Sequence, residues 1–146
     1  MRNTVTWSPL EQLDGAITYW HDKRQPDEAT FVYYGAVPAF RYYLRVHGLD
    51  TQPYSYSQSF VQCRETRDKI CQEFNLYFSP WVRKLSTEEK VENLYEILGG
   101  QPPKVWLIFS HVHGDEEKEM MTLLQQQYEL ADSFVQDNGS AYLLIK

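Results

Sequence analysis

Residues 104–117, Lys-Val-Trp-Leu-Ile-Phe-Ser-His-Val-His-Gly-Asp-Glu-Glu, decide the fold of this chain. The first half, from Val105 to Phe109, is an unbroken apolar run rich in β-branched and aromatic residues. Such a run is too short for a buried helix and is typical of a strand covered on both faces. The second half becomes polar at once and opens a helix at Asp115. We therefore expect a central strand, a loop and then a helix.

The rest of the chain alternates between helical and strand-like patterns. Apolar residues at helical spacing predict helices over residues 10–24, 38–48, 65–78, 86–98 and 115–128. Runs of β-prone residues predict strands over residues 29–34, 54–64, 105–109, 130–136 and 140–146. The last two strands flank a hairpin signal at residues 137–139. This order predicts an α/β fold, a three-layer, Rossmann-like sandwich whose mostly parallel sheet ends in an antiparallel C-terminal hairpin.

Composition limits both the number of domains and the classes of partner. A chain of 146 residues is long enough for one domain with a sizeable core, so residues 1–146 are expected to form a single soluble unit. The formal net charge of −6 argues against a nucleic-acid partner, because neutralising phosphates requires a basic face. No apolar run approaches the roughly 20 residues that a membrane-spanning helix needs.

The two cysteines, Cys63 and Cys71, fit neither a disulfide scaffold nor a usual zinc site. Two free core thiols are the favoured interpretation. One disulfide is the alternative, if the compartment is oxidising and the chain turns between the two residues. On one continuous helix, eight residues would separate the cysteines by about 12 Å, which is too far for that bond.

His111, His113 and Asp115 follow the central strand at alternate positions. Side chains at this spacing can reach one metal ion, and the carboxylate can hold a second ion or a water. The pattern is similar to the first part of the metal motif of metallo-β-lactamase-like hydrolases. That motif continues with a histidine where this chain has Glu116, and no histidine follows His113. We therefore favour polar loop histidines with Asp115 as a helix cap, and we assign no metal ligand.

Tyr34 and Gly35 end the first expected strand and precede the helix-opening Pro38. Ligands of open α/β sheets bind at such strand ends, which makes Tyr34 and Gly35, like His111 and His113, candidate ligand contacts. A dinucleotide fingerprint has three glycines where this turn has one, and Pro38 removes a donor amide from the helix start. We therefore expect no nucleotide and no cofactor.

Trp81 belongs to an aromatic cluster, with the aromatic residues at 74, 77 and 78, and is followed by Arg83 and Lys84. One interpretation is contact with a membrane interface, where aromatic rings lie at headgroup level and basic residues attract anionic lipid. The favoured alternative is an irregular insertion packed on the sheet. Trp81 is accordingly a candidate interface residue.

Three stretches resemble one family. Residues 27–43 place an acid before a strand that ends in tyrosines, then a small-residue turn and a Tyr-Tyr pair. Residues 104–113 have a basic residue, then Val-Trp-Leu and a Ser-His ending, and residues 138–146 contain Gly-Ser-Ala-Tyr-Leu. In this order they resemble the soluble C-terminal region of multi-spanning membrane glycosyltransferases related to the dolichyl-phosphate-mannose protein mannosyltransferases. Residues 63–86 fit the family pattern poorly.

The resemblance implies a specific role. These enzymes transfer a sugar from a lipid-phosphate donor on the extracytoplasmic (periplasmic-side) face of the cytoplasmic membrane. Their catalytic acid lies in a loop between membrane spans that this chain does not contain. The chain would then be a non-catalytic accessory domain of a larger membrane protein, partnered by the membrane-embedded part and in contact with the membrane surface. It would expose aromatic residues on one face, around Tyr34, Tyr42, Tyr54, Tyr56 and Trp81.

Two alternatives stay open from the residues alone. The first is a free-standing, small α/β hydrolase that uses His111, His113 and Asp115 on a metal ion. The second is a soluble ligand-binding module without a link to membranes. No catalytic residue of the glycosyltransferase family can be carried onto a position of this chain.

Overall fold

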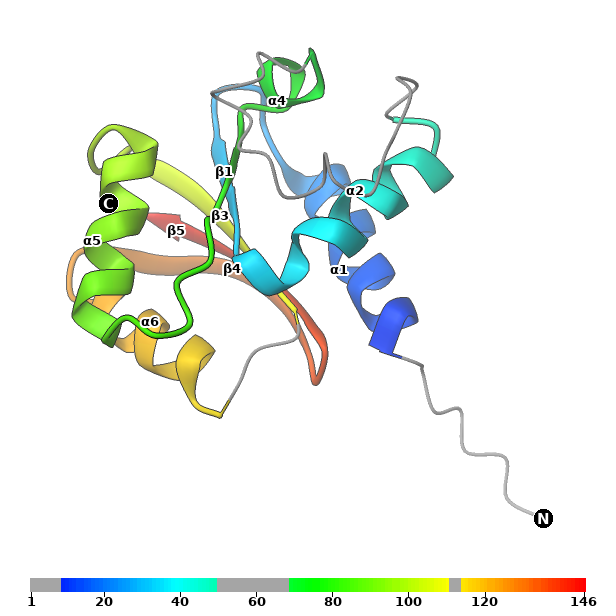
Figure 1. Ribbon diagram of the computed structural model, residues 1–146. Coiled ribbons are helices and arrows are strands. Elements are labelled where there is room, and N and C mark those ends of the chain that lie inside the picture. Colours follow the sequence, from blue (N-terminus) through cyan, green and yellow to red (C-terminus); the bar gives the residue numbers. More distant parts are fainter. Residues whose placement is uncertain (1–8, 50–68, 111–113) are drawn as a thin grey trace.

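The computed structural model describes residues 9–49, 69–110 and 114–146. This part of the chain forms six helical segments and five strands. Figure 1 shows how they are arranged. In chain order they are α1 (Pro9–Lys23), β1 (Ala29–Val32), the 3-10 turn η1 (Tyr34–Ala36), α2 (Val37–Val46), α4 (Lys69–Glu73), β2 (Leu76–Phe78), α5 (Thr87–Leu98), β3 (Lys104–Phe109), α6 (Glu116–Leu124), β4 (Glu129–Gln136) and β5 (Gly139–Ile145).

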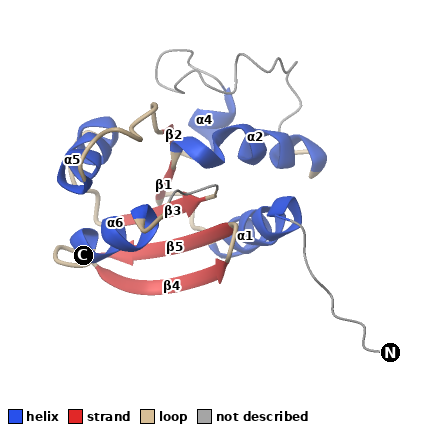
Figure 2. Cartoon of the chain, turned by 60° about the horizontal axis from the view of Figure 1, so that its bottom comes forward, coloured by secondary structure: helices blue, strands red, loops and turns tan. Residues whose placement is uncertain are grey.

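The strands form one open, five-stranded sheet in the order β2-β1-β3-β5-β4. The pairings of β1 with β2 and with β3 are parallel, whereas β5 pairs antiparallel with both β3 and β4. The sheet is therefore parallel at one end and antiparallel at the other, where the C-terminal hairpin forms its edge (Figure 2). This confirms a mixed α/β fold with an antiparallel C-terminal hairpin.

Strand β3 is the central strand, as its apolar run predicts. Its residues from Val105 to Phe109 are all buried, and alternate side chains enter two separate apolar clusters. Trp106 and Ile108 pack with apolar residues of α1 and α2, whereas Leu107 and its neighbours on the other face pack with α5 and α6. Figure 1 shows these two pairs of helices on opposite sides of the sheet. A strand buried on both faces needs apolar residues at every position, and β3 has them.

The indole N–H groups of two buried tryptophans are each paired with an acceptor. The indole Nε1 of Trp20 on α1 donates to the hydroxyl of Thr30 on β1 at 2.8 Å. The indole Nε1 of Trp106 donates at 2.9 Å to the carboxylate of Glu28, which is only 3% exposed. Both tryptophans can be fully buried because each N–H finds an acceptor there.

Helix α5 begins with the capping box that its sequence predicts. The Ser86 hydroxyl accepts from the amide of Glu89 at 3.2 Å, and the Glu89 carboxylate accepts from the amide of Ser86 at 3.0 Å. The helix ends at Gly99, whose φ of 76° is in the left-handed region that favours glycine. These signals define the two ends of helix α5, which covers one face of the sheet.

The helix predicted over residues 65–78 is wrong in its second half. Helix α4 ends at Glu73, Asn75 adopts a positive φ of 52°, and β2 follows as the edge strand beside β1. Asn is among the few residues that tolerate this conformation, so it ends the helix and turns the chain into a strand. The strand predicted over residues 54–64 lies outside the described residues.

Cys71 on α4 is buried and disulfide-bonded. The favoured expectation of free core thiols is therefore wrong for Cys71. Cys63, the other cysteine of the sequence, lies outside the described residues.

Candidate functional site

The polar centre of the molecule lies where the parallel strands end. Tyr33 and Tyr34 directly follow β1, Lys90 lies on α5, and Glu116 is the first residue of α6. The Glu116 carboxylate accepts from the Tyr33 hydroxyl at 2.9 Å, from the Tyr34 hydroxyl at 3.3 Å and from the Lys90 ammonium at 2.8 Å. We call these four residues the Glu116 cluster. Each of its members is buried, with at most 8% of its surface exposed.

The electrostatics of the cluster follow from this burial. Burial, and then the hydrogen bond to Glu116, raise the pKa of the Tyr33 phenol above its ordinary value. Burial and the Glu116 charge likewise raise the pKa of Tyr34, to about 12. Both phenols therefore keep their protons at neutral pH and act as donors to the carboxylate. With Lys90 as counter-ion, the cluster joins β1, α5 and α6 through groups that are closed off from solvent.

Trp81 lies on the outer side of this cluster. Its ring centroid is 4.8 Å from that of Tyr34, so the structure brings together two of the residues that the sequence singled out. Tyr34 is buried, whereas Trp81 is 66% exposed. Of the aromatic residues expected on one exposed face, Tyr42 and Trp81 are exposed, and the expectation is wrong for Tyr34. Tyr54 and Tyr56 lie outside the described residues.

The aromatic cluster expected before α5 is also mostly interior. Phe74 and Phe78 are buried in the apolar core, and Tyr77 is half-buried. Only Trp81 of this group is mostly exposed, because Tyr77 and Phe78 are on β2 and Phe74, directly after α4, is buried in the core. The segment is thus partly a strand and partly an exposed turn.

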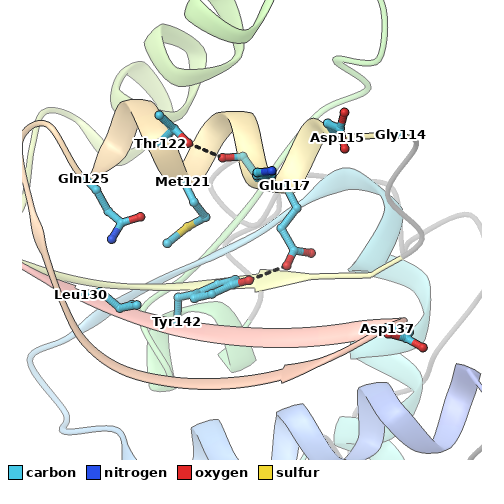
Figure 3. A pocket seen from close by; sticks show the side chains of 10 residues that line it. Gly114, Asp115, Glu117, Met121, Thr122, Gln125, Leu130, Asp137 and Tyr142 are labelled. Carbon is cyan, nitrogen blue, oxygen red and sulfur yellow. Dashed lines mark hydrogen bonds between the residues drawn. The ribbon is translucent and has the colours of Figure 1, made fainter.

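A groove of about 400 Å³ lies between α6 and the C-terminal hairpin (Figure 3). Glu117 and Tyr142 meet in it, where the phenol donates to the carboxylate at 2.5 Å. Burial, and then this bond, raise the pKa of Tyr142 above its ordinary value. Asp115 and Asp137 border the same groove. Among the described residues, Lys118 is the one basic residue that lines the groove, so acidic side chains outnumber basic ones there, and its one tyrosine hydroxyl donates to an acid of the wall.

Asp115 occupies the N-cap position of α6, but its side chain makes no capping hydrogen bond. Asp115 is therefore at the cap position that the sequence predicts, but its carboxylate does not accept the hydrogen bond that a cap usually accepts. Gly35 lies inside η1 and has no positive φ, so the turn there does not depend on glycine. His111 and His113 lie outside the described residues. Within residues 9–49, 69–110 and 114–146, no group of three or more metal-ligating side chains is found.

Sequence patterns missed the roles of Lys90 and Glu116. Acids in the first turn of a helix are usually solvated and complement the helix dipole, but Glu116 is buried. The available signal was Lys90, which shares the inward face of α5 with Leu94 and Ile97. A lysine on an apolar face needs a buried partner, and the sequence does not say which acid supplies it.

No protein-family model matches the chain, and no curated protein matches it. Over the part of the chain that the structure describes, no helix is both long enough and apolar enough to cross a bilayer.

Proposed function

We propose that this chain is a non-catalytic, soluble accessory domain of a membrane glycosyltransferase that uses a lipid-phosphate sugar donor. Its partner is the membrane-embedded part of the same protein, on the extracytoplasmic face of the cytoplasmic membrane. The domain would help to position the donor or the acceptor. We group its fold with three-layer, Rossmann-like sandwiches, because separate apolar clusters pack helices on both faces of the sheet.

The observation that carries the proposal is the placement of the three family-like stretches. Residues 27–43 form β1, η1 and most of α2, residues 104–113 include β3, and residues 138–146 include β5. Although far apart in the sequence, β1, β3 and β5 are consecutive neighbours in the sheet. The resemblance therefore covers the core of one folded unit.

The tyrosines of the first stretch support an accessory role. Tyr33 and Tyr34 donate to the buried Glu116 carboxylate, which is also paired with Lys90. The two tyrosines that end the family-like strand therefore have a structural role, because their hydroxyls stabilise a buried carboxylate. A catalytic acid or nucleophile must reach a substrate, and each member of the Glu116 cluster is buried.

The disulfide at Cys71 supports the extracytoplasmic location. Disulfides persist in oxidising compartments and are rare where cellular thiols are kept reduced. A location on the outer side of the cytoplasmic membrane meets this condition.

An antibody raised against the purified chain tests the proposal in the source cells. We expect it to detect a polypeptide much larger than 17.3 kDa that stays in the membrane fraction after alkaline carbonate washing. Depletion of detergent extracts with the antibody should remove sugar transfer from a lipid-phosphate donor, and the purified chain should not restore it. Depletion with an unrelated antibody is the matched control. Detection of a polypeptide of the chain's own size in the soluble fraction would contradict the proposal.

A further inference from the structure

Trp81 is the most exposed large apolar side chain of the described residues, and it is presented by a fixed turn. Phe78, three residues before it, and Val82, directly after it, face inward, since they are 2% and 4% exposed. The turn between β2 and α5, residues 79–86, is held at both ends. The amide of Ser79 donates to the carbonyl of Val32 at 2.9 Å, and the amide of Leu85 donates to that of Val82 at 3.0 Å.

The indole ring itself rests on the Glu116 cluster. Its contact with the Tyr34 ring, at 4.8 Å between centroids, links it to a side chain that is bonded to Glu116. The ring is therefore supported from below while its outer part is in water. Because the ring is already held in one position, little additional side-chain entropy is lost when it binds to another surface.

The turn is basic, in contrast to the chain as a whole. Residues 79–86 contain Arg83 and Lys84 and no acid, whereas the whole chain has a formal net charge of −6. Both basic side chains are exposed, and neither forms an ion pair with another described residue. The nearest acids in sequence, Glu88 and Glu89, lie in the first turn of α5, where Glu89 bonds the amide of Ser86.

We infer that residues 79–86 dock onto the surface of an anionic lipid bilayer, with Trp81 at headgroup level and Arg83 and Lys84 against lipid phosphates. Tryptophan is enriched at membrane interfaces, and basic residues beside it are attracted to anionic lipid. One projecting ring, followed by two basic residues that form no ion pair with another described residue, suits a fluid, negatively charged surface, which rearranges around it.

This inference goes beyond the proposed function, because it concerns lipid contact by the chain itself and can be tested without a transferase. If it holds, the ends of the parallel strands face the membrane. If it fails, the glycosyltransferase proposal keeps its own test, because contact with the membrane-embedded part of a protein does not require contact with lipid.

The experiment measures partition of the purified chain onto sedimented vesicles. One set contains equal parts of phosphatidylglycerol and phosphatidylcholine, and the other contains phosphatidylcholine alone. We expect binding to the anionic vesicles that weakens as salt is raised, because screening shortens the range of the attraction. The double variant Arg83→Gln/Lys84→Gln should reduce the partition coefficient about 30-fold, since each basic residue near an anionic surface contributes a factor of about five.

The matched control is Lys23→Gln/Lys146→Gln, which removes the same charge away from the turn, near the opposite end of the parallel strands. Lys23 ends α1, and Lys146 follows β5 beside the start of β3. This variant should bind like the parent chain.

Trp81→Ala, with an unchanged thermal midpoint, should weaken binding while leaving its salt dependence in place. The inference is overturned if the parent chain does not bind anionic vesicles, or if the control loses as much binding as the double variant.

Discussion

Replacing Tyr33 with Phe removes one oxygen atom from the Glu116 cluster and leaves the aromatic ring in place. The lost bond joins a buried phenol to a buried carboxylate at 2.9 Å, and nothing on the new side chain can replace the donor. Hydrogen bonds to charged groups contribute about 1.5–3 kcal/mol to stability. For a chain of this size, such a loss lowers the thermal midpoint by about 4–10 °C.

Tyr34→Phe is the matched control for this substitution. The Tyr34 hydroxyl lies 3.3 Å and 3.5 Å from the two Glu116 oxygens, so its bond is long and divided. Such geometry is worth less than a short bond, and we expect a loss of about 1 kcal/mol or less. Both variants keep the ring contacts of the parent residue, so the difference between them reports the hydroxyl groups alone.

Urea unfolding of the three proteins provides the assay. The transition midpoint should fall in the order parent, Tyr34→Phe, Tyr33→Phe, with the same dependence of the unfolding free energy on urea concentration in each. A Tyr34→Phe loss equal to or larger than that of Tyr33→Phe would refute the geometry of the cluster. So would a Tyr33→Phe variant as stable as the parent.

Three further predictions concern other parts of the molecule. Ser86→Ala should lower the unfolding free energy by about 1 kcal/mol, because the first turn of α5 loses its cap; an unchanged urea midpoint would contradict the capping box. Stability should fall as the pH rises from about 10 to 12, because Tyr34 and Tyr128 have pKa values near 12 in the folded state, whereas the unfolded chain releases these protons near pH 10. Each tyrosine should contribute a loss of up to about 1.4 kcal/mol per pH unit, and a flat stability profile over this range would contradict it. Elemental analysis of the purified chain should find far less than one zinc or manganese ion per molecule, and a stoichiometric ion that is lost in His113→Ala would favour the hydrolase alternative.

The central strand and the helix after the capping box were predictable because their signals are local. A continuous apolar run has few structural interpretations other than a buried strand, and the paired Ser86 and Glu89 define a helix start. Residues 69–78 were harder, because Ile70, Phe74 and Phe78 fit a helical stripe as well as the observed helix and strand. Pairing of Leu76 with Thr30, far away in the sequence, selects the strand. Local propensity does not contain that contact.

The polar centre was only half predictable for the same reason. The strand-end rule pointed to Tyr34, which is a member of the Glu116 cluster. Its acceptor, Glu116, is 82 positions away from Tyr34 and resembles an ordinary helix-start acid. Only the packing of α6 beside α5 turns it into a buried partner of Lys90. Patterns of spacing identify which face of an element is inward, but they do not identify which elements meet.

The most direct test of the proposed role is the sequence of the reading frame upstream of the codon for Met1. If the chain is the soluble domain of a membrane glycosyltransferase, that frame continues and encodes several apolar segments of about 20 residues each. An in-frame stop codon directly upstream of Met1, with no such segments joined to the chain, would contradict the proposal.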